Sequence, residues 1–192
     1  MQNPSHLQTA DVQLLFADLQ KQIVKRSKTT EPKALGKSVK VLAQLARVFS
    51  LPVTISVVPE GDASPELIPE LADEAEDTPQ LLRSGASPFL DERTRSILTG
   101  LGRKTLVIAG FATEVVVLHA VTAAIDAGCR ALVAVDACGG LSERTEGAAL
   151  RQIEAYGGEV TSTVTIATAL EPDFTTDRGK QMFAILQQIR LG

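Results

Sequence analysis

The stretch with the clearest chemical arrangement is TLVIAGFATEVVVLHAVTAAIDAG, residues 105–128. It reads as a buried strand, a turn marked by Gly110 and an apolar helix, and many α/β enzymes mount a nucleophile at such a turn. The start of this helix holds Val115, Val116 and Val117 instead. Because valine has no nucleophilic or ionisable group, any chemistry at this turn must come from other residues.

Four other side chains near this turn or at strand ends carry groups that could react, and each has a structural alternative. Asp18 closes the apolar stretch DVQLLFADLQ, where it is either a pocket carboxylate or the cap of a neighbouring turn. Cys138, in VDACGG, is the one thiol that could replace a missing nucleophile, but it lacks the helix N-terminus that lowers the pKa of a thiol, which favours a structural role. His119 is expected to be a packed or interface histidine rather than a general base, and Cys129 to be inert.

Composition limits the class of protein. The 192 residues suit a single domain spanning residues 1–192, and 44% apolar with 22% charged residues is a globular balance. The formal net charge is -4 and basic residues do not cluster, so we expect no nucleic-acid partner. The apolar runs are too short to span a membrane, and no secretory signal begins the chain, so we expect no membrane partner.

The same counts limit the location and the cofactors. Two cysteines without an export signal predict a reduced, cytoplasmic protein. Two cysteines and two histidines are too few for a zinc site, and we expect neither a metal nor another cofactor.

Strand and helix patterns alternate along the chain. Buried strands are predicted at 11–20, 51–58, 104–110, 130–135 and 159–163, and helices at 32–49, from about 88, at 114–127, 142–156 and 175–192. Residues 59–78 include the acidic run ADEAEDTP, which is either a solvated loop with a short helix or, less favoured, an acidic binding surface. The alternation predicts an α/β fold, with a doubly wound, mostly parallel sheet of about six strands and helices on both faces.

In such a sheet ligands lie beyond the carboxyl ends of the strands. The residues to inspect are therefore Asp18, the turn at 110–114 and the segment 136–140.

Three pieces of sequence resemble the isochorismatase-like cysteine hydrolases, which include isochorismatases, nicotinamidases and N-carbamoylsarcosine amidases. They are LLFADLQ, GFATEVVVLHAVTAAIDAG and ALVAVDACGGLSERTEGAALRQIEAYGGEVTST. The middle piece is the most specific, because its residues match the spacing of the family's turn-and-helix pattern: Gly110, Thr113, Val117, Ala124, Asp126 and Gly128. The resemblance covers nearly the whole chain and implies an isochorismatase-like, Rossmann-like fold.

The resemblance also implies an active site with an aspartate, a lysine and a cysteine, in which the thiolate attacks a carbonyl carbon and the aspartate is general base and acid. Asp18, followed by Gln20, matches the aspartate. The lysine's place falls on Arg83 in RSGASPF, and the cysteine's place falls on Val116. Arginine keeps a positive charge but does not exchange its proton near neutral pH.

Further positions follow from the same resemblance. The peptide bond from Phe111 to Ala112 is expected to be cis, and the backbone N–H groups at the helix start are expected to converge on an anion hole. The expected pocket-lining residues, besides the three catalytic positions, are Gln20, Phe89, Phe111, Ala112 and Thr113. The segment PEGDASPEL, where metal-binding members place histidines, has none, so no metal is expected.

Two functions remain open at this stage. The first is a homologue without cysteine-hydrolase activity that acts through binding of a small molecule, such as a carboxylate, or through assembly into a homo-oligomer. The second is an active hydrolase of isochorismatase type, in which Asp18 works with water or as an acid without a thiol. Whether the chain is an enzyme is therefore uncertain from its sequence.

Overall fold

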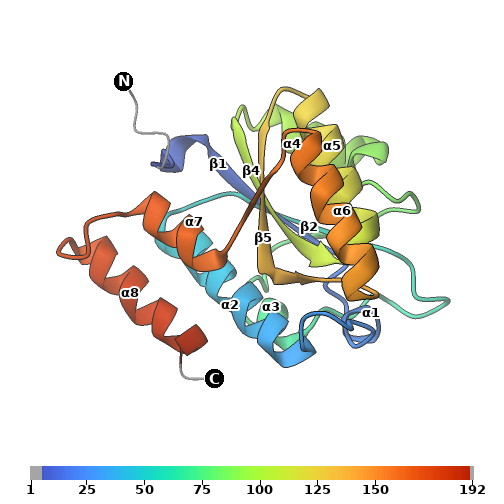
Figure 1. Ribbon diagram of the computed structural model, residues 1–192, viewed down its shortest axis with the longest axis horizontal. Helices are drawn as coiled ribbons and strands as arrows, with labels where there is room; N and C mark the ends of the chain where they lie inside the picture. Colours follow the sequence, from blue (N-terminus) through green and yellow to red (C-terminus); the bar gives the residue numbers. More distant parts are fainter. Residues whose placement is uncertain (1–5, 191–192) are drawn as a thin grey trace.

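Six parallel strands form one sheet in the order β3-β2-β1-β4-β5-β6 (Figure 1). The computed structural model describes residues 6–190. The strands are β1 (Val12–Ala17), β2 (Val53–Val57), β3 (Gln80–Leu82), β4 (Thr105–Phe111), β5 (Arg130–Gly139) and β6 (Glu159–Thr161). The chain builds outward from β1 to β3, then returns to the centre and builds the other way from β4. The strand order therefore reverses between β1 and β4.

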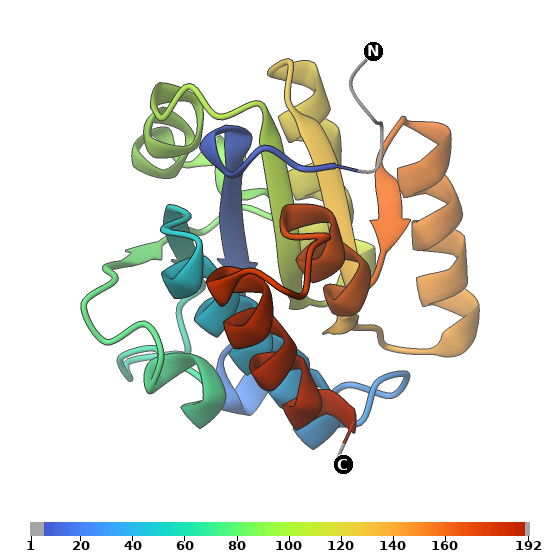
Figure 2. The same ribbon diagram turned by 90° about the vertical axis from the view of Figure 1, so that its left-hand side faces the viewer.

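Helices cover both faces of the sheet. One face carries α2 (Pro32–Val48) and α7 (Thr163–Leu170), and α8 (Asp177–Arg190) lies over α2, as Figure 2 shows from that side. The opposite face carries α4 (Glu92–Gly100), α5 (Leu118–Asp126) and α6 (Glu143–Ala155). Two single-turn helices, α1 (Lys21–Val24) and α3 (Pro69–Ala72), and the short turns η1 (Thr9–Asp11), η2 (Pro88–Leu90) and the π-helical η3 (Thr113–Val117) complete the fold. The predicted fold class is confirmed.

The apolar pattern of the sequence explains this layering. Every residue of β1 and β4 is buried, as expected for central strands of a parallel sheet with helices on both faces. The buried residues form two clusters, one on the side of α2, α7 and α8 and one on the side of α4, α5 and α6. In α2, Leu35, Val39 and Leu42 recur at helical spacing on the buried face, and the Glu31 side chain accepts a hydrogen bond from the Ala34 N–H at 2.9 Å.

Several predicted element ends differ from the structure: the first strand ends at Ala17 rather than at residue 20, and the helix expected from 114 is π-helical until α5 begins at Leu118. β5 was expected to end at 135 but continues to Gly139, after an irregularity in its pairing with β4. The last strand was expected to reach Thr163, but Thr163 begins α7, because Ser162 caps that helix by accepting from Thr165 N–H. The α-helix expected from 88 starts at Glu92, because Asp91 accepts from Thr94 N–H at 2.8 Å and Pro88 belongs to η2. The predicted C-terminal helix is present as α8, and residues 1–5 and 191–192 lie outside the described range.

Gly110 permits the close approach of β4 to β1. A Cβ at this position would lie 2.5 Å from the Ala17 carbonyl oxygen, which belongs to the backbone of the neighbouring strand and cannot rotate away.

We expect Gly110→Ala to lower the free energy of unfolding by about 1–3 kcal/mol, the usual cost of overpacking, as measured by urea denaturation. Gly100→Ala is the matched control: a Cβ there meets nothing within 4 Å, so stability should stay equal or rise. Equal losses in both variants would contradict this account.

Candidate functional site

The predicted site lies where the strand order reverses. Asp18 directly follows β1, and the register pairs Ala17 with Gly110, so Asp18 stands beside the end of β4 and the turn η3. In open parallel sheets, the crevice at such a reversal is the usual ligand site. The fold therefore places the retained carboxylate where a ligand is expected.

Asp18 and Arg83 form a closed ion pair. The Arg83 Nη1 and Nη2 atoms each donate to a different Asp18 carboxylate oxygen, at 2.6 and 2.7 Å, which is the bidentate geometry that guanidinium and carboxylate groups favour. The Arg83 side chain is 1% exposed and the Asp18 side chain 10%. Both terminal nitrogens of Arg83 are thus engaged with Asp18, so a ligand that binds through those nitrogens must displace the carboxylate.

Neighbouring strands hold this pair in place. Arg83 follows β3, and its backbone N–H donates to the Val57 carbonyl of β2 at 3.0 Å. Its Nη1 also donates to the hydroxyl of Ser56, the second-last residue of β2, at 3.1 Å. Sequence reasoning missed Ser56, although a serine inside the strand VTISV was a visible signal. The Nε of Arg83 is buried and has no hydrogen-bond partner among residues 6–190.

Asp18 has an unusual backbone. Its φ is +56°, in the left-handed region that aspartate tolerates better than most residues but that still costs about 1–2 kcal/mol. The Asp18 N–H donates to the Ser56 carbonyl at 2.9 Å, so β2 fixes this conformation through its backbone as well. Strained backbone of this kind is often found at functional sites, which agrees with the position of Asp18 at the strand reversal.

Val116 lies in the interior. Its side chain is 0% exposed and belongs to the buried cluster that also contains Phe89, Ala17 and Cys138. The turn η3 that carries it is π-helical and precedes α5. Val115, next to it, is 42% exposed. The side of this turn that faces the sheet is thus filled by apolar side chains, and none of them can attack a substrate.

The other predicted pocket residues are used in other ways. The Gln20 side chain bonds both backbone groups of Val58, donating to the carbonyl at 3.0 Å and accepting from the N–H at 2.9 Å. The Thr113 hydroxyl bonds the Gly139 carbonyl at 3.1 Å and a Glu146 carboxylate oxygen at 2.8 Å. These polar groups hold the loops around the strand ends, and their hydrogen-bonding capacity is largely occupied.

Phe111 and Ala112 face a different core from Val116. Both belong to the cluster on the α2 side of the sheet, whereas Phe89 and Val116 belong to the cluster on the α5 side. The peptide bond between Phe111 and Ala112 is cis, as the resemblance implied. The Ala112 carbonyl accepts from Val115 N–H at 3.0 Å and from Val117 N–H at 3.5 Å, so these two N–H groups are used inside the turn.

Two residues near the predicted strand ends have structural surroundings. Cys138 lies within β5 rather than beyond it, pairs with Gly110, and is buried, and this burial raises the pKa of its thiol to about 12. Asp136 accepts from the N–H and hydroxyl of Thr163 at 2.8 and 3.0 Å, so it anchors the start of α7. The extension of β5 past residue 135 explains both placements. Cys129 is half-buried, which raises the pKa of its thiol.

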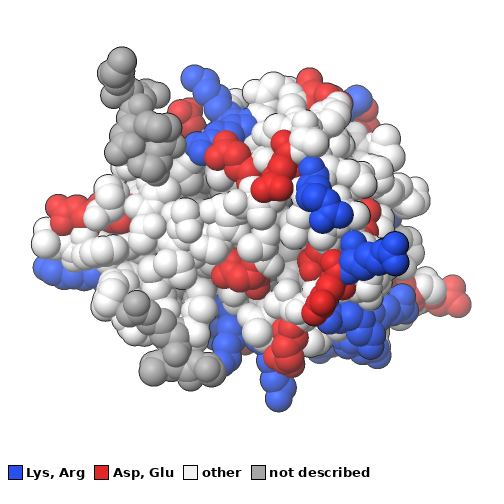
Figure 3. All heavy atoms as spheres, viewed as in Figure 1, with Lys and Arg blue, Asp and Glu red and all other residues white. Residues whose placement is uncertain are grey.

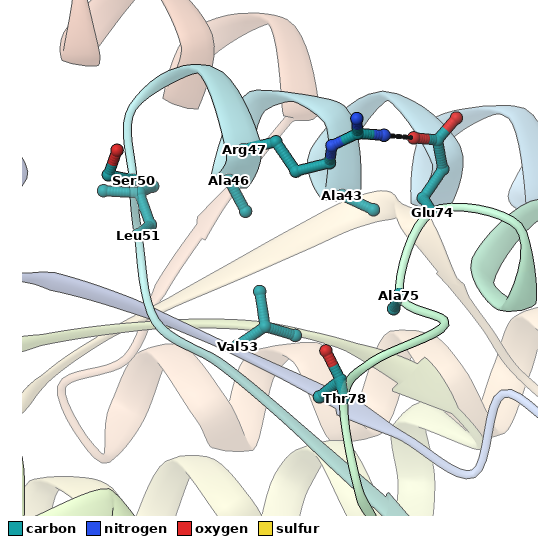
Figure 4. A pocket seen from close by; sticks show the side chains of 9 residues that line it. All are labelled: Ala43, Ala46, Arg47, Ser50, Leu51, Val53, Glu74, Ala75 and Thr78. Atoms are coloured by element: carbon teal, nitrogen blue, oxygen red, sulfur yellow. Dashed lines mark hydrogen bonds and ion pairs between the residues drawn. The ribbon is translucent and has the colours of Figure 1, made fainter.

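A cavity of about 280 Å³ lies away from the predicted site, between the end of α2 and the acidic segment before β3 (Figure 4). Arg47 donates to Glu74 at 2.8 Å across its edge. Glu74 also accepts from Gln44 at 2.7 Å. The acidic run is thus fastened to α2 through Glu74, and α3 is the short helix expected beside it.

Acidic and basic side chains lie next to one another on the face drawn in Figure 3, and neither sign forms a separate patch there. Between residues 6 and 190, no helix combines the length and apolarity needed to cross a bilayer. In the same range, histidine, cysteine and acidic side chains do not gather in groups of three that could hold a metal.

Comparison with known proteins identifies the family. Residues 12–165, most of the chain and all of the strands that form the site, match the isochorismatase domain. The chain belongs to the isochorismatase family. Among curated proteins, it is 29% identical over 168 residues to the Escherichia coli (strain K12) protein YcaC, named a probable hydrolase, covering 87% of this chain and 81% of that one.

Solved structures agree with this assignment. YcaC from Pseudomonas aeruginosa, described with hexane-2,5-diol and covalent acrylamide, superposes with a TM-score of 0.89 at 26% identity, covering 98% of this chain and 93% of that one. E. coli YcaC, described as an octameric hydrolase of unknown specificity, gives the same TM-score and identity and covers 100% and 96%. A Streptococcus mutans pyrazinamidase/nicotinamidase, at 19% identity and a TM-score of 0.68 over 78% and 99%, shares the fold.

The buried ion pair leads to a stability prediction. Removing one partner leaves a buried charge without compensation, which typically costs about 3–5 kcal/mol. We expect Arg83→Met to lower the free energy of unfolding by about this amount, and Asp18→Asn/Arg83→Met to recover most of the loss, in urea denaturation. Arg130→Met, which breaks the exposed pair with Glu159, is the control and should cost less than about 1 kcal/mol. Additive losses in the double variant would contradict a coupled pair.

Burial also predicts the reactivity of Cys138. Since the pKa of its thiol is about 12, almost no thiolate exists at pH 8 and iodoacetamide cannot reach the sulfur. Mass spectrometry after timed alkylation of the native protein should find Cys138 unmodified, and both cysteines modified in urea. The Cys138 thiol has a lower pKa in the unfolded chain than in the native one. The unfolded state therefore binds fewer protons above about pH 9, and the contribution of this thiol to the free energy of unfolding falls as the pH rises further. Native labelling of Cys138 at a rate near that of a free thiol would show that it is accessible.

Proposed function

We propose that this protein is an isochorismatase-family hydrolase homologue that lacks cysteine-hydrolase activity and acts through small-molecule binding or assembly. The observation that carries the proposal is the side chain of Val116, which is apolar and fully buried at the head of α5, the place that corresponds to the family's cysteine. A valine there cannot attack a carbonyl carbon. Acyl transfer through a thioester therefore has no nucleophile at this turn.

The ion pair supports the same proposal. Arg83 takes the lysine's place, and both of its terminal nitrogens are held by Asp18. An arginine does not release its proton near neutral pH, so the pair cannot relay protons as an aspartate and lysine can. A carboxylate ligand must compete with Asp18 for the terminal nitrogens of Arg83.

Assembly into a homo-oligomer is the second part of the proposal. E. coli YcaC, similar along its whole length, is described as an octamer. The half-exposed Val115 at the outside of the same turn agrees with contact between copies.

We further propose a cytoplasmic location, because both cysteines are free.

An alternative is a hydrolase that uses Asp18 with water or as an acid. Asp18 retains 10% side-chain exposure and a left-handed backbone at the strand reversal, the features of a functional carboxylate. In this alternative the proton is taken by the second lone pair that each Asp18 oxygen keeps beside its bond to Arg83, because general-base catalysis needs a free carboxylate lone pair within hydrogen-bond reach of the proton.

Product release from a panel of small amides and from isochorismate tests the proposal. We expect the wild type to be silent, and Val116→Cys/Arg83→Lys to gain amidase turnover and to be alkylated by acrylamide at position 116, because a thiol at the head of a helix has a lowered pKa. Val117→Cys/Arg83→Lys is the matched control, since Val117 is equally buried in the same turn. Its new thiol should stay silent.

Turnover by the wild type would decide between the two functions. If the wild type releases product and Asp18→Asn abolishes the release, the protein is a hydrolase that needs no thiol and the proposal is wrong. Asp18→Asn is preferred to alanine, because asparagine keeps the shape of the side chain and tolerates the left-handed backbone.

A further inference from the structure

The outer face of α5 is free of charged side chains apart from its C-terminal Asp126. Residues 115–125 contain no lysine, arginine, aspartate or glutamate. Of the other surface helices, α2, α4 and α6 carry such residues in their middle turns, whereas α7 carries none and α8 has none between residues 181 and 189. A helix exposed to water normally has a polar outer face, so an uncharged one marks a surface that another molecule covers.

An apolar groove runs between α5 and α6. Its volume is about 340 Å³, and its lining residues are Leu118, His119, Thr122, Gln152, Ala155 and Tyr156. The small side chains Thr122 and Ala155 leave room for a neighbouring helix to approach closely. The groove is thus shaped by the backbones of two helices rather than by a few mobile side chains.

Large apolar side chains border this groove. Val115 lies one turn before it on the chain and is 42% exposed, and Tyr156 at its other end is 47% exposed. On the adjoining turn η2, Leu90 is 75% exposed, and the Ser87 hydroxyl of that turn donates to the His119 carbonyl at 3.2 Å. We call the surface formed by Leu90, Val115, Leu118, His119, Thr122 and Tyr156 the α5 face.

The acids at the two ends of the α5 face are bound within the chain. Glu114 accepts from Leu141 N–H at 2.9 Å and from the Thr145 hydroxyl at 2.6 Å, both at the start of α6. Asp126 accepts from the Tyr156 hydroxyl at 2.8 Å. Both acids at the ends of the face are therefore already hydrogen-bonded within the chain.

We propose that the α5 face is where two copies of this chain pair around a two-fold axis. The inference rests on the homo-oligomer proposed above and adds its location. A partner of opposite charge is disfavoured because the face has almost no charge to match, whereas an identical neutral surface is complementary to it. A stable interface buries about 800 Å² per partner, more than one short helix offers, so α6 and η2 must take part as well.

Pairing at this face also bears on the candidate site. Turn η2 carries Phe89, which belongs to the buried cluster around Val116, and the hydrogen bond from Ser87 ties η2 to α5. A second copy seated on α5 and η2 holds this turn in place over the inner cluster. Assembly and the closed state of the site are therefore mechanically linked.

Charge insertion tests the location of the interface. We expect Val115→Glu and Thr122→Glu to raise the dissociation constant about 100-fold or more and to reduce the mass measured by light scattering to half or less, because each charge is buried twice at a two-fold interface. Phe183→Glu on α8 is the matched control, since Phe183 is 45% exposed, and it should leave the mass unchanged. Circular dichroism and a urea midpoint check that all three variants are folded.

The possible results separate the two proposals. A monomeric wild type overturns the homo-oligomer and this inference together. A wild-type oligomer that survives both α5 variants, or that only Phe183→Glu dissociates, overturns the α5 face and leaves the homo-oligomer standing.

Cross-linking gives a second measurement that does not depend on destabilising the protein. In a Cys129→Ser background, His119→Cys or Thr122→Cys should form a disulfide-linked dimer under mild oxidation, because disulfides require Cα atoms within about 7 Å and these positions lie at the centre of the face. Phe183→Cys in the same background should remain uncross-linked. A dimer formed through position 183 and not through 119 or 122 places the contact on α8 instead.

Discussion

The pairing of β1 with β4 is the constraint on which the rest of the molecule depends. Both strands are buried along their whole length, and they approach so closely at Ala17 and Gly110 that no side chain fits between them. This contact joins the two halves of the sheet and sets the point at which the strand order reverses. The carboxylate of Asp18 and the turn before α5 are neighbours because these two strands end side by side.

The Asp18–Arg83 pair gives this reversal point its chemical character. A carboxylate alone at a strand end is an acceptor open to ligands, whereas a carboxylate held by both terminal nitrogens of a buried guanidinium is a neutral, closed unit. Such a pair contributes little net stability, because the cost of removing two charges from water offsets their attraction. The Nε of Arg83 is buried without a hydrogen-bond partner in the part of the chain that the structure describes, which adds to the cost of burying the pair.

Sequence reasoning predicted the parts of the fold that follow from apolar periodicity and the family resemblance. The alternation of the longer strands and helices, the buried central strands and the family were confirmed, whereas β3 and α7 were not predicted. The bonding between Asp18 and Arg83 could not be predicted, because it depends on β3 lying beside β2, and three residues of strand carry too weak a pattern to fix that position. The extension of β5 was missed for a related reason: its irregularity interrupts the alternation on which strand ends are judged.

The run Val115, Val116, Val117, Leu118 shows how one stretch of apolar residues serves two environments. Val116 and Val117 point into the core, while Val115 and Leu118 lie at the surface. The Val116 side chain fills the inner side of the turn and belongs to the same buried cluster as Phe89. Under the proposed function no substrate has to react at this position, so the inner side of the turn can stay filled while its outer side stays apolar. The residue types of this helix are then limited by contact between copies and no longer by a reaction, and an uncharged outer face suits such contact.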